Sequence, residues 1–247
     1  NATGVIGCND IIINGGGFID SYDSSKGGYD SNSNRANNAF VALVNGNSEN
    51  VQGEPSRIPL GLSVINGDFT AYNGYVTTKG NGSIVSGNVV ANGKVILNGN
   101  TTIGGNVSAK NEVTLNGNNT VGGAVHAGGE FIANSGTVVS GNVSANSVRM
   151  NGNTEISCSV TSNGELTMSG NNTTIGGNAS ASTADIKGTI KGSLSVDSSS
   201  ISTDNGNGKA LGGVTYNATS RAKNVAPTMP DPGELTNICQ QNVASNT

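Results

Sequence analysis

The stretch that decides the fold is residues 103–120, which read IGGNVSAKNEVTLNGNNT. The preceding residues 85–102 read VSGNVVANGKVILNGNTT, and the following residues 121–138 read VGGAVHAGGEFIANSGTV. In the central copy a β-branched anchor is followed by glycine at +2, an apolar residue at +4 and alanine at +6. Self-similarity at a fixed period is the mark of a repeat architecture.

The pattern extends well beyond these three copies. Its anchors are Ile65, Val85, Ile103, Val121, Val139, Ile156, Ile175 and Ile190. Successive anchors are 20, 18, 18, 18, 17, 19 and 15 residues apart. The period is therefore about 18 residues, and the repeat occupies most of the chain.

The spacing of apolar residues within each copy predicts β-strands. Apolar positions alternate, as in a half-buried strand, and a second short strand follows about ten residues after the anchor. Asn-Gly or Ser-Gly pairs between strands supply the positive φ of sharp corners. Because each copy repeats the same order of strands, we expect the copies to stack in parallel as a β-solenoid with strand, corner, strand and corner in each coil.

The coil dimensions agree with this prediction. About 18 residues at ~3.3 Å each give a perimeter of roughly 60 Å, which suits a flattened or triangular section, and stacking at ~4.8 Å gives a rod roughly 40 Å long. A thin interior explains why only 34% of the residues are hydrophobic. The predicted inward positions of the central coil are Ile103, Gly105, Val107, Ala109, Val113 and Leu115.

Composition and charge exclude several classes of protein. Charged residues make up 11% of the chain and the formal net charge is −4, with no basic stripe for nucleic acid. No apolar run approaches the ~18 residues of a membrane span. The chain begins at Asn1 without a signal-like segment, which suggests a mature form from which a targeting segment has been removed.

We expect three regions along the chain. Residues 1–62 form irregular N-terminal coils and a cap, residues 63–216 the solenoid, and residues 217–247 a proline-containing tail that is a cap, an arm or disordered.

The three cysteines fit no zinc or redox motif. Cys8 and Cys239 lie in the two flanks and are candidates for a disulfide, within one chain if the tail folds back along the rod, or between stacked neighbours. Cys158 replaces a +2 glycine, and we expect it to be a small buried hydrophobe.

The sequence offers little material for catalysis or cofactor binding, so we expect neither. The only histidine, His126, falls at an outward position and is expected to be solvated. Glu112, Glu130 and Glu165 recur at one repeat position and are interpreted as a solvated column; paired acids for a carbohydrate-active enzyme are the alternative.

A weak calcium candidate lies in the N-terminal flank. Asp30, Asn32 and Asn34 provide oxygens at positions 1, 3 and 5 of a calcium loop, but Arg35 occupies the sixth position, where the loop needs glycine. A polar turn is the favoured interpretation.

Two polar columns are predicted on the outside. Asn88, Asn106, Asn142 and Asn178 share the +3 position, where stacked amides can form an Asn ladder. Asn106, Asn142 and Asn178 also begin Asn-x-Ser/Thr sequons, which leave glycosylation open. Ice binding would need a flat, two-column threonine array, and only one interrupted column is seen. Its members are Thr102, Thr120, Thr174 and Thr189.

The run from Ile103 to Ala109, followed by Val113-Thr114-Leu115, resembles the bactofilin or polymer-forming repeat. The resemblance covers roughly residues 62–200 and implies a right-handed parallel β-helix that polymerises through its ends without nucleotide. The segment from Asp20 to Ser25 is similar to a stretch in secreted, pilus-associated bacterial proteins that carry such a repeat. The Asn and Gly richness, the long N-terminal region and the cysteines differ from cytoplasmic bactofilins.

These observations together predict a structural protein rather than an enzyme. We expect an extracellular or cell-surface filament subunit whose partner is a further copy of itself, because open solenoid ends present unpaired strands. Pilus or other surface components are further candidate partners. An adhesin or pilus-tip binding module that uses the loop at residues 20–38 is the alternative, and a carbohydrate-active enzyme or an ice-binding protein is a weaker one.

Overall fold

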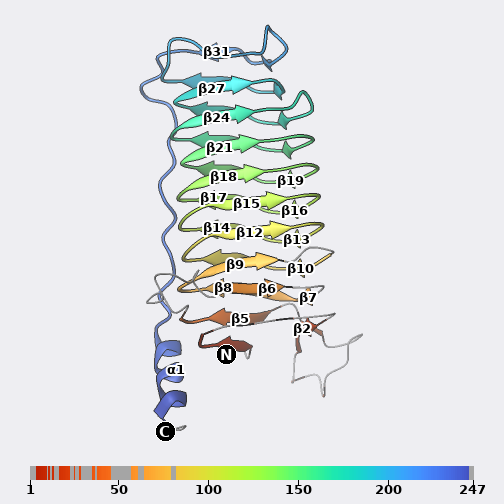
Figure 1. Cartoon of the computed structure of the whole chain (residues 1–247), viewed down its shortest axis with the longest axis vertical. Coiled ribbons are helices and arrows are strands. Elements are labelled where there is room, and N and C mark those ends of the chain that lie inside the picture. Colours follow the sequence, from red (N-terminus) through yellow and green to blue (C-terminus); the bar gives the residue numbers. More distant parts are fainter. Residues whose placement is uncertain are drawn as a thin grey trace.

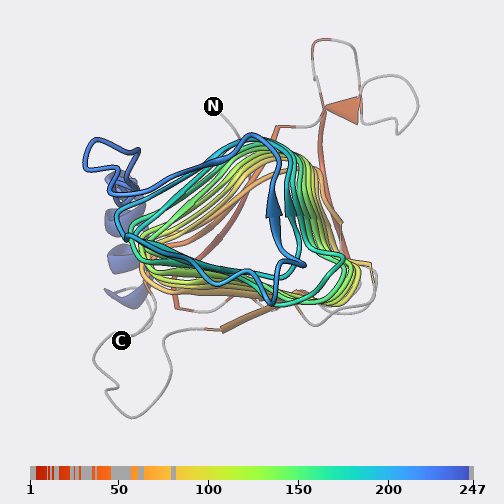
Figure 2. The same ribbon diagram turned by 90° about the horizontal axis from the view of Figure 1, so that it is seen from above.

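The chain forms a three-sided β-solenoid in a computed structural model that describes residues 4–9, 11, 13, 17–22, 25, 28, 35–36, 38–45, 57–60, 64–78 and 82–244. Parallel strands stack in about 8 turns of roughly 18 residues along the rod of Figure 1, which confirms the predicted fold class. Seen along the rod, the turns superpose as a triangle (Figure 2). Each side of the triangle is one parallel sheet, and we name the sheets faces A, B and C.

Within the described residues, face A has eleven strands, face C has ten and face B has eight. The strands of face A are β1 (Val5–Gly7), β5 (Ala39–Leu43), β8 (Gly67–Ala71), β11 (Val89–Ala91), β14 (Val107–Ala109), β17 (Val125–Ala127), β20 (Val143–Ala145), β23 (Val160–Ser162), β26 (Ala179–Ala181), β29 (Leu194–Val196) and β31 (Val214–Thr215). Those of face C are β2 (Phe18–Ile19), β7 (Val64–Ile65), β10 (Ile84–Val85), β13 (Thr102–Ile103), β16 (Thr120–Val121), β19 (Val138–Val139), β22 (Glu155–Ile156), β25 (Thr174–Ile175), β28 (Thr189–Ile190) and β30 (Lys209–Ala210). Those of face B are β6 (Arg57–Leu60), β9 (Tyr75–Thr78), β12 (Val95–Asn98), β15 (Val113–Asn116), β18 (Glu130–Ala133), β21 (Ser147–Met150), β24 (Glu165–Met168) and β27 (Thr183–Ile186).

Each complete turn has three strands, where the sequence predicted two. The chain passes from face C to face A to face B and then climbs to the next turn. The predicted first strand is broken between Ile103 of β13 and Val107 of β14, because Gly104 and Gly105 form a corner there. Because glycine has no side chain, these two residues let the backbone bend and approach the turn beneath it.

Like positions of successive turns lie in register. Val107 pairs with Val89 below it and with Val125 above it. Each inward residue therefore stacks on its counterpart, so the core is a set of apolar columns parallel to the rod axis.

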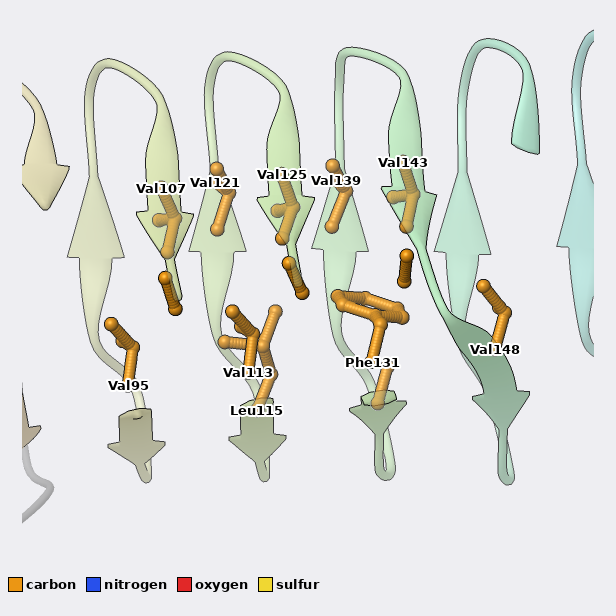
Figure 3. Packing of buried hydrophobic residues seen from close by; sticks show 14 of the residues in the cluster. Val95, Val107, Val113, Leu115, Val121, Val125, Phe131, Val139, Val143 and Val148 are labelled. Atoms are coloured by element: carbon orange, nitrogen blue, oxygen red, sulfur yellow. The ribbon is translucent and has the colours of Figure 1, made fainter. Parts of the chain in front are cut away.

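The apolar columns fill the interior, as Figure 3 shows for the middle turns. Ile103, Val107, Val113 and Leu115, which the sequence places inward, are fully buried. Phe131 stands in the column of Val113 and Val148, and the larger ring is accommodated because the next inward residue of its strand is Ala133. Large and small residues thus compensate within one turn.

The flanking regions belong to the same rod. Strands β1, β2, β5 and β6 already lie in the three faces, so the solenoid extends into the region predicted as irregular coils. A short antiparallel pair, β3 (Ser21–Tyr22) with β4 (Arg35–Ala36), interrupts the first turn. After β31 the chain turns back and runs along one edge of the prism to α1 (Glu234–Ala244), beside the N-terminal turn (Figures 1 and 2). We call residues 216–233 the arm.

Replacing the central aromatic ring tests the packing of the core. Phe131→Ala is expected to lower the free energy of unfolding by about 3–5 kcal/mol, because the columns above and below keep the cavity open. The outward neighbour provides a control, since Ile132→Ala is expected to cost less than about 1 kcal/mol. Urea denaturation followed by circular dichroism measures both, and equal losses would contradict the assignment of inward and outward faces.

Candidate functional site

The acidic column lies on the surface at the edge where face B begins. The register of face B places Glu112, Glu130, Ser147 and Glu165 above one another, so a serine interrupts the acids. Glu130 lies 3.7 Å from Arg149, and both side chains are well exposed. This arrangement is that of a solvated column of charges.

No metal centre emerges from the described residues, among which no group of three or more His, Cys, Asp or Glu side chains comes together. Asp30, Asn32 and Asn34, the candidate calcium ligands, lie outside the described residues. The threonine column lies on the outer surface of face C, where Val138 and Glu155 interrupt it between Thr120 and Thr174.

The asparagines at the +3 position make a different contact from the amide ladder that the sequence predicts. Asn88, Asn106, Asn142 and Asn178 are exposed, but their amides do not stack on one another. Instead the Oδ1 of each accepts a backbone N–H from the turn above, as when Asn88 accepts from Asn106 at 2.8 Å. The column alternates with Ala124 and Ser159, so continuous amide stacking is impossible and the main chain supplies the donor.

The true amide ladder lies at the corner between faces B and C. Asn116 donates from Nδ2 to Oδ1 of Asn98 at 3.0 Å, Asn134 donates to Asn116 at 2.7 Å, and Asn151 donates to Asn134 at 2.8 Å. These residues end the face B strand or follow it directly. In the sequence the Asn-Gly pairs that begin at Asn98, Asn116 and Asn151 predict corners, but they do not predict the ladder.

A second polar column at this corner is fully buried. Each of its side chains donates to the carbonyl oxygen three residues earlier, at 2.6–2.9 Å, so that the corner carbonyls are satisfied inside the rod. Its members are Thr101, Asn119, Thr137, Thr154 and Thr173. Their recurrence at 18, 18, 17 and 19 residues was the signal available in the sequence.

The +2 position is a corner and does not face inward. Gly105 is only half-buried, and Cys158, expected to be buried, is exposed with a free thiol. A Cβ added to Gly105 would lie 2.3 Å from Oδ1 of Asn88 and 2.8 Å from the carbonyl oxygen of Gly87. Glycine is therefore needed here to make room for the +3 side chain of the turn below.

The arm is held against the solenoid by a buried arginine. The side chain of Arg221 is 1% exposed and forms two bonds to Asp197, from Nε to Oδ1 at 2.8 Å and from Nη2 to Oδ2 at 2.9 Å. Nη1 donates to the carbonyl oxygen of Ser162 at 2.7 Å and Nη2 to that of Asn163 at 3.0 Å. A buried guanidinium is stable when its donors are satisfied in this way.

A second anchor follows three residues later. Asn224 donates from Nδ2 to the carbonyl oxygen of Ala127 at 3.0 Å and exchanges two hydrogen bonds with Asn163. The next residue, Val225, places its carbonyl oxygen against Nε2 of His126. His126 is thus half-buried under the arm, and the expectation of a solvated histidine was wrong.

The arm ends in a covalent link to the N-terminal turn. Cys8, directly after β1, and Cys239, in α1, form a disulfide within one chain, with Cα atoms 5.4 Å apart. Cys239 is 4% exposed, and Cys8 is half-buried. Of the two arrangements that the sequence left open, the structure has the one in which the tail folds back along the rod.

The two ends of the rod carry most of the exposed large apolar side chains. Val5, Ile6 and Phe18 belong to the first turn and Tyr22 to the strand pair that leaves it. Leu211 belongs to the last turn and Tyr216 begins the arm directly after it, and each of the six is 38–64% exposed. Val5 continues the inward column of Val41 and Phe69 and is 40% exposed, because none of the described strands lies beneath it. The core columns therefore reach the surface at the N-terminal end.

Comparison of the chain with family models, with curated proteins and with solved structures finds no match. In the part of the chain that the structure describes, no helix has the length and apolar character needed to cross a membrane. Disulfides are typical of proteins that reside in oxidising compartments.

The glycine corners make a testable contribution to stability. Gly105→Ala is expected to destabilise the fold by about 1–3 kcal/mol, because the new Cβ must displace Asn88 or the strand beneath it. Gly28→Ala serves as the control, since a Cβ there meets nothing within 4 Å. Thermal unfolding of the two variants measures the difference, and a neutral Gly105→Ala would contradict this packing.

The pKa of Asp197 reports the docking of the arm. The hydrogen bond from Arg221 holds this pKa below its ordinary value of 3.8, with a smaller contribution from the charge of Lys223. Protonation of Asp197 is therefore expected to weaken the arm as the pH falls from 3.8 through the lowered pKa. In a ¹³C NMR titration, Arg221→Met should return the pKa to about 3.8, whereas Lys223→Met should move it less. An unchanged pKa in Arg221→Met would show that the contact does not persist in solution.

Proposed function

We propose that the protein is a structural subunit of an extracellular or cell-surface filament, in which solenoids associate end to end. The observation that carries this proposal is the position of the exposed apolar residues, which gather on the first and last turns. Apolar surface of this kind is typical of sites that bind another protein.

The chemistry of the two ends suits a second copy of the same chain. Inward columns end in part-exposed Val5 at one end and in half-buried Ala210 and Val214 at the other. Among the described strands, β1 at the first turn and β30 and β31 at the last each pair with a strand on one side only. Stacking the last turn of one copy on the first turn of the next would continue both the columns and the sheets.

Such a contact joins two different surfaces, so it does not close on itself. A head-to-tail contact of this type produces an open filament. The strands of all three faces run parallel from turn to turn, so the same strand order can continue across the junction.

We also propose that the protein works outside the reducing cytoplasm. The disulfide between Cys8 and Cys239 supports this location, because thiol buffers keep most cytosolic cysteines reduced. Pilus or other surface components are the partners expected beside further copies of the chain.

A binding module is the second candidate function. The antiparallel pair β3–β4 leaves the first turn and projects beyond the outline of the triangle (Figure 2). Asn66 fixes its base by donating from Nδ2 to Asp20 at 2.9 Å and to the carbonyl oxygen of Ala36 at 3.0 Å. Tyr22 is 47% exposed on this projection and could contact a ligand.

Sedimentation velocity and negative-stain electron microscopy test the filament proposal. We expect the oxidised protein to form rods longer than one solenoid as its concentration rises. Val5→Asp and Leu211→Asp should each reduce assembly, because they place a charge in the apolar contact at opposite ends. Ile84→Asp is the matched control: Ile84 is 39% exposed, like Val5, but lies on the side of face C.

Persistent monomers of the parent protein at high concentration would refute the filament. An equal loss of assembly in Ile84→Asp would show that the contact lies on the sides of the rod instead. Circular dichroism of each variant establishes that the solenoid itself is intact.

A further inference from the structure

The arm and α1 together are attached to the rod at two separate places. The upper attachment, nearer the C-terminal end of the rod, consists of Arg221 and Asn224. Their side chains form hydrogen bonds with turns in the middle and upper part of the rod. The lower attachment is the disulfide at Cys239, 15 positions after Asn224. Residues 226–238 between them are mostly exposed. The disulfide therefore holds the lower arm and α1 independently of the upper anchors.

The partner of Cys239 lies beside a terminal strand of the solenoid. Strand β1 has three residues and, among the described strands, pairs with β5 alone; Val5 and Ile6 are 40% and 38% exposed. A terminal strand that packs against one neighbour opens more readily than a strand inside the array. Cys8 follows β1 directly, so the disulfide fastens this strand to α1.

We propose that the Cys8–Cys239 disulfide is a redox clasp for the N-terminal end of the rod. In the oxidised protein the clasp holds β1 and α1 together as one ordered end. When a dithiol reduces it, β1 and residues 226–244 detach, while the upper arm and the remaining turns keep their structure.

The inference rests on the proposed filament, because the clasped end is the surface that receives the last turn of the next copy. An ordered β1 offers, in fixed positions, the apolar column of Val5 and a strand edge that no other described strand pairs, whereas a detached β1 offers neither. Oxidation therefore makes the end competent for assembly. A chain kept reduced before export would assemble only after it reaches an oxidising compartment.

The redox step is a thiol–disulfide exchange. A dithiol gives two electrons and two protons to the disulfide, so that the S–S bond breaks, Cys8 and Cys239 become thiols, and the reagent becomes a cyclic disulfide. A groove lies beside the disulfide. It is lined by Cys8, Asn9, Asn45, Cys239 and Gln240. Cys8 is the more exposed of the two cysteines and is the expected point of attack.

Hydrogen exchange measured by mass spectrometry tests the clasp directly. On reduction with dithiothreitol we expect exchange of residues 5–8 and 226–244 to rise at least about tenfold, and that of residues 85–196 to stay unchanged. Cys239→Ser should reproduce the reduced pattern without reagent, and Cys158→Ser, which removes the free thiol, should leave the oxidised pattern unaltered. Unchanged exchange at residues 5–8 would overturn the clasp, and so would faster exchange throughout the rod.

Sedimentation of the same samples separates this inference from the proposed function. Assembly of the oxidised protein that is lost on reduction and regained on reoxidation supports both. Equal assembly of oxidised and reduced protein would overturn the role of the clasp and leave the filament standing. If neither form assembles, the filament proposal fails and the role of the clasp in assembly fails with it, whatever the exchange pattern.

Discussion

The whole structure depends on one constraint, the stacking of each turn on the next with like positions in register. Backbone bonds repeat along the rod, as when Gly105 donates to Gly87 and Gly123 donates to Gly105, both at 2.9 Å. Because neighbouring turns are only ~4.8 Å apart, each side chain contacts first the side chains at the same position in the turns above and below it. Columns, rather than single residues, are therefore the units of stability.

This constraint explains why polar residues are as regular as apolar ones. At the corners the chain must turn without leaving buried carbonyl oxygens unpaired, and the column that includes Thr101 and Asn119 satisfies them from inside. The ladder of Asn98 and Asn116 adds hydrogen bonds along the axis just outside. The abundance of Asn and Gly reflects these corner requirements, as the sequence predicts, but it is divided among columns with different tasks.

The repeat made the fold predictable from the sequence, whereas the features that depart from the repeat could not be predicted. The alternation of apolar residues predicts that Val107, Val113 and Leu115 lie in the core, because the same pattern recurs in every turn. The third strand of each turn was missed since it has only two residues, too few for a period. Gly105 was placed inside because a small residue beside apolar ones suggests a narrow core, whereas the space is needed by Asn88 of the turn below.

The docking of the arm could not be predicted from the sequence for a related reason. Arg221 and Asn224 belong to no period, and their partners are largely carbonyl oxygens of distant turns, which no residue type reveals. The cysteines pointed to a link between the flanks but left two arrangements open.

The arm also changes how the ends of the rod should be understood. A stack of turns has no intrinsic length, and each end exposes strands and core that a further turn would cover. At the C-terminal end the last turn passes inside the outline of the triangle (Figure 2) and brings half-buried Ile201 against the core. At the N-terminal end the inward column of face A ends at exposed Val5, and a disulfide outside the sheet holds its strand in place. One end is thus partly closed by its own chain, while at the other the described strands leave Val5 exposed, so the two ends of the rod present different surfaces.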